Sequence, residues 1–335
     1  MDHLGIDLGG KESQVCARSP DGAIRWEGKW PTAKLGEYLR ECPTSRVVLE
    51  TCAEAFAVAD AAAAAGHDVR VVPCSLVRSL GVGARGLKTD ERDARALSEV
   101  SCRIELPSVH RPSASARQWK TLCGTREVLV ESRTKLVNSV KGWMRTQTER
   151  VRSGVVSTLP KRVRHHYAAK AAPLPPCIER QLEAIDQLSR QIAEADKEQL
   201  AVPEAHPTCQ RLLTVPGEGP VTAIRFVAAI DDVARFGGAH ALESYLGLVP
   251  GENSSSERKR RTGITKAGAA KLRWALVQAS WSARRCRPND PMVRWAAQIE
   301  QRRGRRIAMV ALARKMAGIL YALWRDGTTY RASEA

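Results

Sequence analysis

The amino-acid sequence predicts an α/β domain at the N-terminus, then long helices, then a mostly helical C-terminal domain. Strand and helix patterns alternate through roughly the first hundred residues, which is typical of an α/β layer built on a mixed sheet. The middle of the chain instead shows long helical periodicity, and short helical patterns separated by glycine and proline turns follow it. The expected boundaries are 1–110, 111–205 and 206–335.

Three short strand patterns separated by turns open the chain and predict an antiparallel meander. A compact apolar strand, an alanine-rich helix closed by Gly66 and another strand follow. A basic linker then leads to a helix that begins near Asp90. The expected strands are 2–7, 14–17, 23–30, 46–49 and 68–72, and the expected earlier helices are 35–42 and 53–65.

The remainder of the chain is predicted to be helical. In the middle segment apolar residues recur at steps of three and four, which suits a coiled-coil hairpin or a dimer seam. A break rich in proline and alanine is expected at 157–176, and a loop at 247–266. The expected helices are 113–151, 178–200, 221–230, 239–246, 267–286 and 304–325.

The composition favours a polyanionic partner. The 335 residues include 53 Lys and Arg against 36 Asp and Glu, giving a formal net charge of +17. Nucleic acid is the commonest partner of such a chain, and no amphipathic, aromatic-anchored basic helix suggests a membrane surface. The nine cysteines form no CxxC pair, so neither a disulfide framework nor a zinc site is expected.

Asp90 and Asp93 stand three residues apart at the start of a predicted helix. This spacing places both carboxylates on one helical face, where they can hold a cation between them. Thr89 suits the N-cap position, and acids in the first turn suit the helix dipole. A capped surface helix is therefore the simpler interpretation of this stretch alone.

Two further carboxylates change that balance. Asp7 ends the first predicted strand and Glu50 ends a later one. Strand-end side chains can converge at one edge of a sheet, and a helix packed across that edge can add Asp90 and Asp93. Such a cluster needs a counter-charge, and an oxygen-rich set of this kind suits Mg²⁺.

Two segments of the C-terminal half are candidates for contact with an anion. Gly217 and Gly219 lie in a turn ahead of a helix, where backbone N–H groups could bind an anion. A helical hairpin that needs glycine at positive φ explains this turn equally well. Three serines, 254–256, precede the basic run 258–261, and such a loop could supply a nucleophile or only an anion-binding turn.

Six motifs occur in an order that resembles one known family. Gly5-Ile6-Asp7, Leu49-Glu50-Thr51 and Lys88-Thr89-Asp90-Glu91-Arg92-Asp93-Ala94 resemble the DEDD signature of IS110-family transposases. In the second half, residues 215–223 are similar to that family's "IPGIG…TA" hairpin. Residues 247–255 resemble its "GLxP…S" segment, and residues 264–273 resemble its "ITKxG…LR" segment.

The resemblance implies an RNase H-like (RuvC-like) N-terminal domain and a site-specific DNA recombinase. In this family the carboxylates bind Mg²⁺ and a serine of the second domain attacks the DNA phosphodiester, which leaves a covalent protein–DNA link. Related elements use a structured bridge RNA to choose donor and target DNA. Carried onto this chain, the resemblance gives Asp7, Glu50, Asp90 and Asp93 as the catalytic and metal-binding set and Ser255 as the nucleophile.

Two positions depart from the family pattern, and Ser254 remains an alternative nucleophile because three serines are consecutive. Cys52 replaces the glycine that usually follows the threonine after Glu50, and Ser256 replaces the glycine after the nucleophile. The expected nucleic-acid contacts are Lys88, Arg92, Gly217, Gly219, Arg258, Lys259, Arg260, Arg261 and Lys266.

Three other functions remain open at this point. A hydrolytic junction resolvase would use the same carboxylates with water as the nucleophile. Residues 6–11 resemble the opening of actin-like sugar kinases, but the second phosphate loop and the adenosine-binding glycine motif of those enzymes are missing from the sequence. A degenerate copy would bind nucleic acid without catalysis.

We expect a bacterial cytoplasmic protein that associates with the nucleoid when bound to DNA. It is expected to assemble as a homo-oligomer, a dimer or tetramer, because two duplexes must be held together for strand exchange. The helices of 111–205 are the expected interface. Each active site could then combine one chain's carboxylates with another chain's serine.

Overall fold

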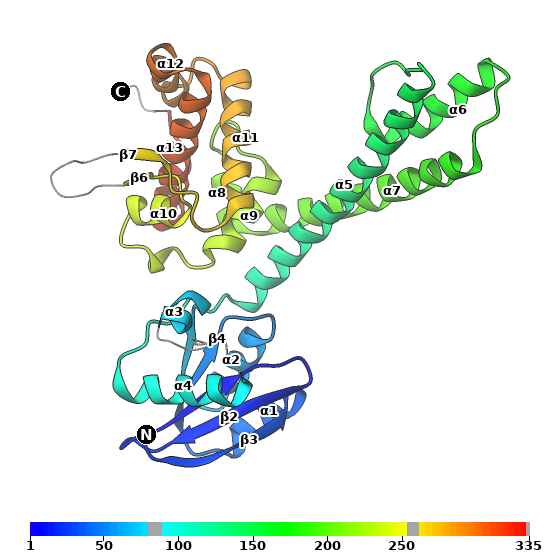
Figure 1. The fold of residues 1–335 in the computed structure, drawn as a ribbon. Helices are drawn as coiled ribbons and strands as arrows, with labels where there is room; N and C mark the ends of the chain where they lie inside the picture. The colour runs from blue at the N-terminus through cyan, green and yellow to red at the C-terminus, as the bar shows by residue number, and fades with distance from the viewer. Residues whose placement is uncertain (80–88, 253–260, 333–335) are drawn as a thin grey trace. The chain divides into compact units, whose positions relative to one another are not determined.

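The computed structural model describes residues 1–79, 89–252 and 261–332. The chain divides into two compact units, Met1–Pro112 and Ser113–Ala335 (Figure 1). The first is an α/β unit, and the described residues of the second are helical apart from one small hairpin.

The N-terminal unit is built on a mixed five-stranded sheet in the order β3-β2-β1-β4-β5. The first three strands form the predicted antiparallel meander, and β4 and β5 continue the sheet parallel to β1. All five predicted strands are confirmed. Their bounds are β1 Asp2–Asp7, β2 Glu12–Arg18, β3 Ile24–Pro31, β4 Ser45–Glu50 and β5 Asp68–Val72.

Helices cover both faces of this sheet because successive strand residues point to opposite sides. Val47 and Leu49 pack with α1 (Leu35–Glu41) and α2 (Ala55–Ala64), whereas Val48 packs with Leu97 of α4 (Asp90–Arg103). A turn η1 (Thr32–Lys34) precedes α1, and the short helix α3 (Cys74–Ser79) follows β5. The predicted helix that begins at Asp90 is therefore α4.

In the second unit, α5 (Ala114–Thr146) and α7 (Pro176–Ala205) pack along each other as a helical hairpin. Five apolar positions of the predicted periodic pattern in α7 are buried: Ile178, Leu182, Ile185, Ile192 and Ala195. The break predicted at 157–176 is wrong in part, because η3 (Val156–Thr158) and α6 (Leu159–Ala169) lie there. Pro160 sits in the first turn of α6, where a missing N–H costs no helical hydrogen bond.

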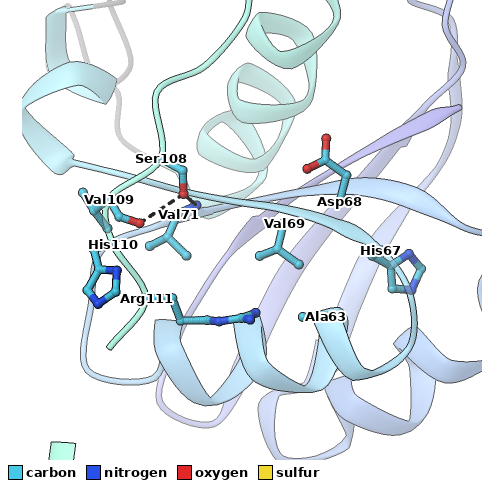
Figure 2. Close-up of a pocket in the computed structure, with 9 residues that line it drawn as sticks. All are labelled: Ala63, His67, Asp68, Val69, Val71, Ser108, Val109, His110 and Arg111. Atoms are coloured by element: carbon cyan, nitrogen blue, oxygen red, sulfur yellow. Dashed lines mark hydrogen bonds between the residues drawn. The ribbon is translucent and has the colours of Figure 1, made fainter. Parts of the chain in front are cut away.

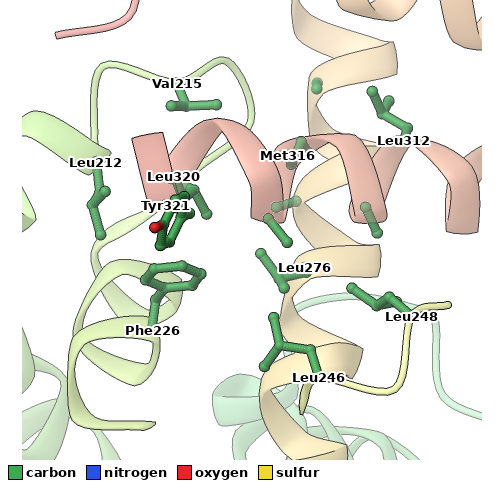
Figure 3. Close-up of a cluster of buried hydrophobic side chains, with 14 of the residues drawn as sticks. Leu212, Val215, Phe226, Leu246, Leu248, Leu276, Leu312, Met316, Leu320 and Tyr321 are labelled. Atoms are coloured by element: carbon green, nitrogen blue, oxygen red, sulfur yellow. The ribbon is translucent and has the colours of Figure 1, made fainter. Parts of the chain in front are cut away.

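In the part of the chain that the structure describes, six further helices enclose the core of the second unit (Figure 3). Phe226, Leu276 and Met316 lie at its centre and are fully buried. The helix α12 fills a stretch for which no helix is predicted; Asp290 caps it by accepting the Met292 N–H at 2.9 Å. The helices are α8 Pro207–Leu212, α9 Pro220–Ile230, α10 Ala239–Tyr245, α11 Ala270–Cys286, α12 Pro291–Arg303 and α13 Arg305–Asp326, with a turn η4 Val233–Arg235.

Among the described residues, α13 is the one helix long and apolar enough by composition to cross a membrane. Half of its most apolar stretch is buried inside the protein, and Leu312, Met316 and Leu320 belong to the core. Its apolar character is thus explained by its place as the central helix of this unit.

The loop predicted at 247–266 contains a short antiparallel hairpin, which corrects that prediction. Its strands are β6 (Pro250–Glu252) and β7 (Arg261–Ile264), and Pro250 pairs with Ile264. Pairing across so few residues leaves little periodic signal in the sequence.

Candidate active site

Asp7 and Glu50 leave two neighbouring strands at the same edge of the sheet. β1 and β4 are parallel, and Ile6 pairs with Leu49, so the next residue on each strand is a carboxylate. Their side chains also share a face, because each lies two residues beyond an in-register pair, Gly5 and Val48. Both residues are half-buried.

Gly5 fixes where α4 crosses this face. A methyl group at Gly5 would overlap the backbone of Ala94 and Ser98, so the helix lies directly on the strand at this point. Nearer the start of β1, His3 Nδ1 and Ser101 Oγ form a 2.7 Å hydrogen bond. His3 thus lies beside Ser101, and Gly5 lies beside the earlier helical residues Ala94 and Ser98, so α4 runs antiparallel to β1.

Extending this alignment by two strand residues brings the start of α4 to Asp7. Two strand residues span about 6.6 Å, and about four or five helical residues cover the same length. The level of Asp7 therefore corresponds to residues 90–93 of the helix. On this alignment the start of α4 lies toward the end of β1, where Asp7 stands beside Glu50 of the neighbouring strand. That the four carboxylates form one site stays a prediction.

The first turn of α4 has the predicted cap. Thr89 Oγ1 accepts the Arg92 N–H at 3.3 Å. Asp93 is only 4% exposed and begins the buried stripe that continues through Leu97 and Ser101, whereas Asp90, one turn earlier on that face, is exposed. Asp93 therefore faces the interior of the unit, and Asp90 faces solvent.

The donor chemistry of this edge fits a hard divalent cation, since all four side chains offer carboxylate oxygens. In the side-chain positions described, no three His, Cys, Asp or Glu residues come close enough together to hold a metal ion. A bound ion would therefore require the side chains of Asp7, Glu50 and Asp90 to turn toward buried Asp93.

Of the basic residues near this edge, some are bound by carboxylates and others are exposed to solvent. Arg95 is held by carboxylates, donating from Nε to Glu27 Oε2 at 2.6 Å and from Nη2 to Glu91 at 2.6 Å. The hydrogen bond from Arg95 keeps the pKa of Glu27 below its usual range. Arg92 is exposed, and Lys88 lies outside the described residues.

In the second unit, the turn between α8 and α9 packs against α11. Gly217 has φ of +84°, and a methyl group there would overlap the backbone of Ala279 and Ala283. Gly219, by contrast, has open space around it and is the N-cap of α9. Close packing against α11 thus explains why position 217 is a glycine. The contact of either glycine with nucleic acid stays a prediction.

The base of the hairpin β6–β7 is a tightly packed turn. Lys266 has φ of +57°, which is uncommon for a residue with a side chain, and it is exposed. Its N–H donates to Gly247 O at 3.1 Å, and Gly247 has no room for a methyl group beside Ala267. Arg273 Nη1 joins both sides of the turn by donating to Leu246 O at 2.9 Å and Ala267 O at 2.7 Å.

The remaining predicted residues of this half fall on the segment between β6 and β7. Arg261 begins β7. Ser254, Ser255, Arg258, Lys259 and Arg260 lie outside the described residues.

Comparisons with known proteins match both units. A family model described as "Transposase", for DEDD transposases of the IS110 type, matches residues 4–147, and a model of the transposase IS116/IS110/IS902 family matches residues 209–293. The chain belongs to the IS110 family of transposases. It is accordingly an enzyme that acts as a DNA transposase or recombinase.

Relatives of this IS110-family chain match along nearly its whole length. A "Probable family 20 transposase" of Pseudomonas aeruginosa is 28% identical over 99% of both chains. The transposase for insertion sequence element IS1111A of Coxiella burnetii is 28% identical over 98% of this chain and 91% of its own. The transposase for IS1328 of Yersinia enterocolitica is 26% identical over 98% of each.

A hollow of about 420 Å³ in the transposase's N-terminal unit lies away from the carboxylates (Figure 2). It is lined by Val69 and Val71, which face α2, the side opposite to α4. His67 uses both ring nitrogens, accepting from Ser45 N at 3.1 Å and bonding Leu39 O at 2.7 Å. Arg111 Nη1 donates to Ala59 O at 3.1 Å. These polar groups are therefore used in hydrogen bonds within the fold.

Two residues that shape the transposase's site are not among its predicted site residues. Gly5 enters the prediction only as part of a motif, although its missing side chain allows α4 to lie on β1. Arg273 likewise enters only as part of a motif, although its guanidinium joins the two sides of the hairpin base. The role of Gly5 could have been predicted from the sequence, because a glycine inside an apolar strand often marks the close approach of another backbone.

Proposed function

We propose that this transposase cuts and rejoins DNA at specific sites through a covalent serine–DNA intermediate, with Mg²⁺ held by the carboxylates at the sheet edge. The observations that support the proposal are the β1–β4 register, which brings Asp7 and Glu50 to one edge of the sheet, and the close contact of α4 with Gly5. The mixed sheet with helices on both faces supports a RuvC-like assignment for this unit.

The carboxylates are proposed to act as the ligands of the metal. Asp93, already buried, would be the fixed ligand, and the half-buried Asp7 and Glu50 and the exposed Asp90 would turn toward it. When bound, Mg²⁺ would neutralise phosphate charge and polarise the P–O bond. Without a cation, carboxylates brought together would raise one another's pKa, and the site would bind phosphate poorly.

Ser255 is proposed as the nucleophile, with Ser254 as the alternative. The serine oxygen forms a bond to phosphorus, and the bond from phosphorus to one deoxyribose oxygen breaks. The serine proton is lost to a base, and the released sugar oxygen gains a proton. Because one phosphoester replaces another, the reverse step can rejoin a new DNA end without ATP.

The basic residues of the hairpin are proposed to hold the strand near the serine. Arg258, Lys259, Arg260 and Arg261 would bind phosphates. Lys266 would do so from the strained turn at the hairpin base, and backbone strain of this kind is enriched at functional sites. Lys88, Arg92, Gly217 and Gly219 complete the proposed nucleic-acid contacts.

The organisation of the active enzyme is part of the same proposal. The division into a catalytic domain 1–110, a helical segment 111–205 and a serine-bearing domain 206–335 assigns chemistry to both ends of the chain. A bridge RNA would select the DNA sites, in the bacterial cytoplasm and at the nucleoid. A dimer or tetramer joined through the long helices would hold the two duplexes.

A covalent adduct assay tests the chemistry. The protein is incubated with cognate DNA, bridge RNA and Mg²⁺, and then denatured. We expect a protein–DNA adduct whose attachment site maps to Ser255, and we expect Ser255→Ala to abolish it while Ser254→Ala retains it. Cleavage without any adduct would instead support the hydrolytic junction resolvase, which uses the same carboxylates with water.

A further inference from the structure

The second unit carries a hollow that the catalytic proposal does not use. It has a volume of about 870 Å³ and lies between α12, α13 and the tail after α13. Cavities of a few hundred to a thousand Å³ accommodate small organic groups. Its side chains are contributed mainly by Met292 and Trp295 of α12, Lys315 and Ile319 of α13, and Tyr330 and Arg331 of the tail.

Tyr330, which lines the hollow from the tail after α13, is held by hydrogen bonds of both its backbone and its side chain. The Tyr330 N–H donates to Thr214 Oγ1 at 2.8 Å, and the Tyr330 hydroxyl donates to Asp290 Oδ1 at 2.9 Å. Asp290 also accepts the Met292 N–H as the cap of α12. The aromatic ring of Tyr330 is therefore fixed beside the hollow, and the nearby carboxylate is already engaged.

The hollow combines an aromatic surface with positive charge. Lys315 Nζ lies 4.6 Å from the centre of the Trp295 ring, so a cation and an indole are presented together. Arg331 adds a second cation, and the described residues that line the hollow include neither Asp nor Glu. On α12, Arg302 lies seven residues beyond Trp295 and hence on the same helical face, which extends the positive charge away from the hollow.

We propose that this hollow binds an unpaired base of single-stranded DNA, with the base against Trp295 and Tyr330 and the flanking phosphates on Lys315, Arg331 and Arg302. Proteins that bind single strands combine base stacking on aromatic rings with cations along the backbone. Thr328 and Thr329 add hydroxyls to the lining that can bond base edges. DNA is the occupant because the enzyme acts on DNA, and strand exchange must expose unpaired nucleotides.

The proposal rests on the family's DNA activity and not on the serine chemistry, so the two can fail separately. Full-length protein is titrated into a fluorescent oligothymidylate of about ten nucleotides, within the site size of known single-strand binders. We expect Trp295→Leu to weaken binding at least about fivefold, because the aromatic face is lost while apolar bulk stays. Trp295→Phe should retain most of the affinity, and Lys315→Gln should reduce the salt dependence of binding.

A matched control uses another exposed tryptophan. Trp274 of α11 is 60% exposed and does not line the hollow, so Trp274→Leu should bind the oligothymidylate as the unsubstituted protein does. Circular dichroism and thermal unfolding confirm that each variant is folded. Equal losses for Trp274→Leu and Trp295→Leu would overturn the proposal.

Crosslinking locates the base directly. An oligothymidylate carrying one 5-iododeoxyuridine is irradiated with the full-length protein, and the modified peptides are identified by mass spectrometry. We expect adducts on the peptides that contain Trp295 or Tyr330. Adducts confined to other peptides, or binding of oligouridylate in place of oligothymidylate, would contradict a single-stranded DNA site here.

Discussion

At the scale of single residues, the least ordinary group is the carboxyl of Glu218, in the turn between α8 and α9. Both of its oxygens are fully covered, and neither has a hydrogen-bond partner among the described residues. Burial raises its pKa from 4.5 to about 8. Burial also raises the pKa of the Cys209 thiol to about 12, with a smaller contribution from the nearby Glu218 carboxyl. The family motif "IPGIG" has an apolar residue at this position, so an acid here introduces a cost of folding that depends on pH.

This cost gives a prediction for stability. Because the folded state holds the proton more tightly, the contribution of Glu218 is most favourable below about pH 4.5 and is lost as the pH rises toward 8. Glu218→Gln should therefore raise the free energy of unfolding at pH 8 by roughly 4 kcal/mol and change it little near pH 4. Denaturant titrations over this range measure the effect.

A surface acid provides the control for that measurement. Glu198 of α7 is exposed, and Glu198→Gln should leave the pH dependence of stability unaltered. If the Glu218→Gln protein shows the same fall in stability with pH as the unsubstituted one, the carboxyl is not buried as described.

At the scale of elements, the proposed catalytic edge depends on one close contact between a strand and a helix. α4 can lie on β1 only because Gly5 has no side chain, and the contact carries Asp90 and Asp93 to the level of Asp7. Hydrogen bonds from Arg18 Nε to Ser98 Oγ at 3.0 Å and between His3 and Ser101 keep the helix in this register. The edge is thus positioned by residues outside the acidic set.

Substitution of Gly5 tests this positioning. Gly5→Ala should displace α4, lower the stability of the N-terminal unit by roughly 1–3 kcal/mol and reduce DNA cleavage far more than that loss explains. Gly10 has open space around it, so Gly10→Ala should retain cleavage and stability. Full cleavage by a folded Gly5→Ala protein would show that α4 need not touch β1 for activity.

Much of the element pattern can be predicted from the sequence because strong periodicity and turn residues mark it. The strands around Asp7 and Glu50 and the cap at Thr89 are of this kind, and the predicted convergence of carboxylates follows from them. The departures from prediction are the helical segment around α6, the helix α12 and the hairpin β6–β7. The prolines near Pro160 predict a break, although proline also suits a first helical turn, and the pairing of Pro250 with Ile264 depends on packing that no local pattern encodes.

At the scale of the whole molecule, the two groups of proposed catalytic residues belong to different units of the chain, Met1–Pro112 and Ser113–Ala335. In the second unit, an ion pair between buried Arg225 of α9 and half-buried Glu127 of α5 connects the long helices to the helical core. Lys271 of α11 reinforces this connection with an ion pair of 2.9 Å to Glu131. The long hairpin is therefore connected to the helical core of its own unit, the part of the chain that also contains the proposed serine.

A mixing experiment tests whether active sites are shared between chains. Asp7→Asn removes a proposed metal ligand, and Ser255→Ala removes the proposed nucleophile, so each variant alone should be inactive. If oligomers combine one chain's carboxylates with another chain's serine, a mixture should regain part of the recombination activity. A mixture that stays inactive, although sedimentation shows mixed oligomers on DNA, would place the whole active site within one chain.

The central claim is that the edge formed by β1, β4 and α4 holds the divalent metal, and iron-mediated cleavage of the protein tests it most directly. Fe²⁺ bound in place of Mg²⁺, with ascorbate and peroxide, cuts the backbone beside the site, and mass spectrometry identifies the cuts. We predict cuts near Asp7, near Glu50 and between Asp90 and Asp93, all suppressed by excess Mg²⁺ and lost in Asp93→Asn. Cuts that cluster elsewhere in the chain, or that persist unchanged in Asp93→Asn, would contradict the account.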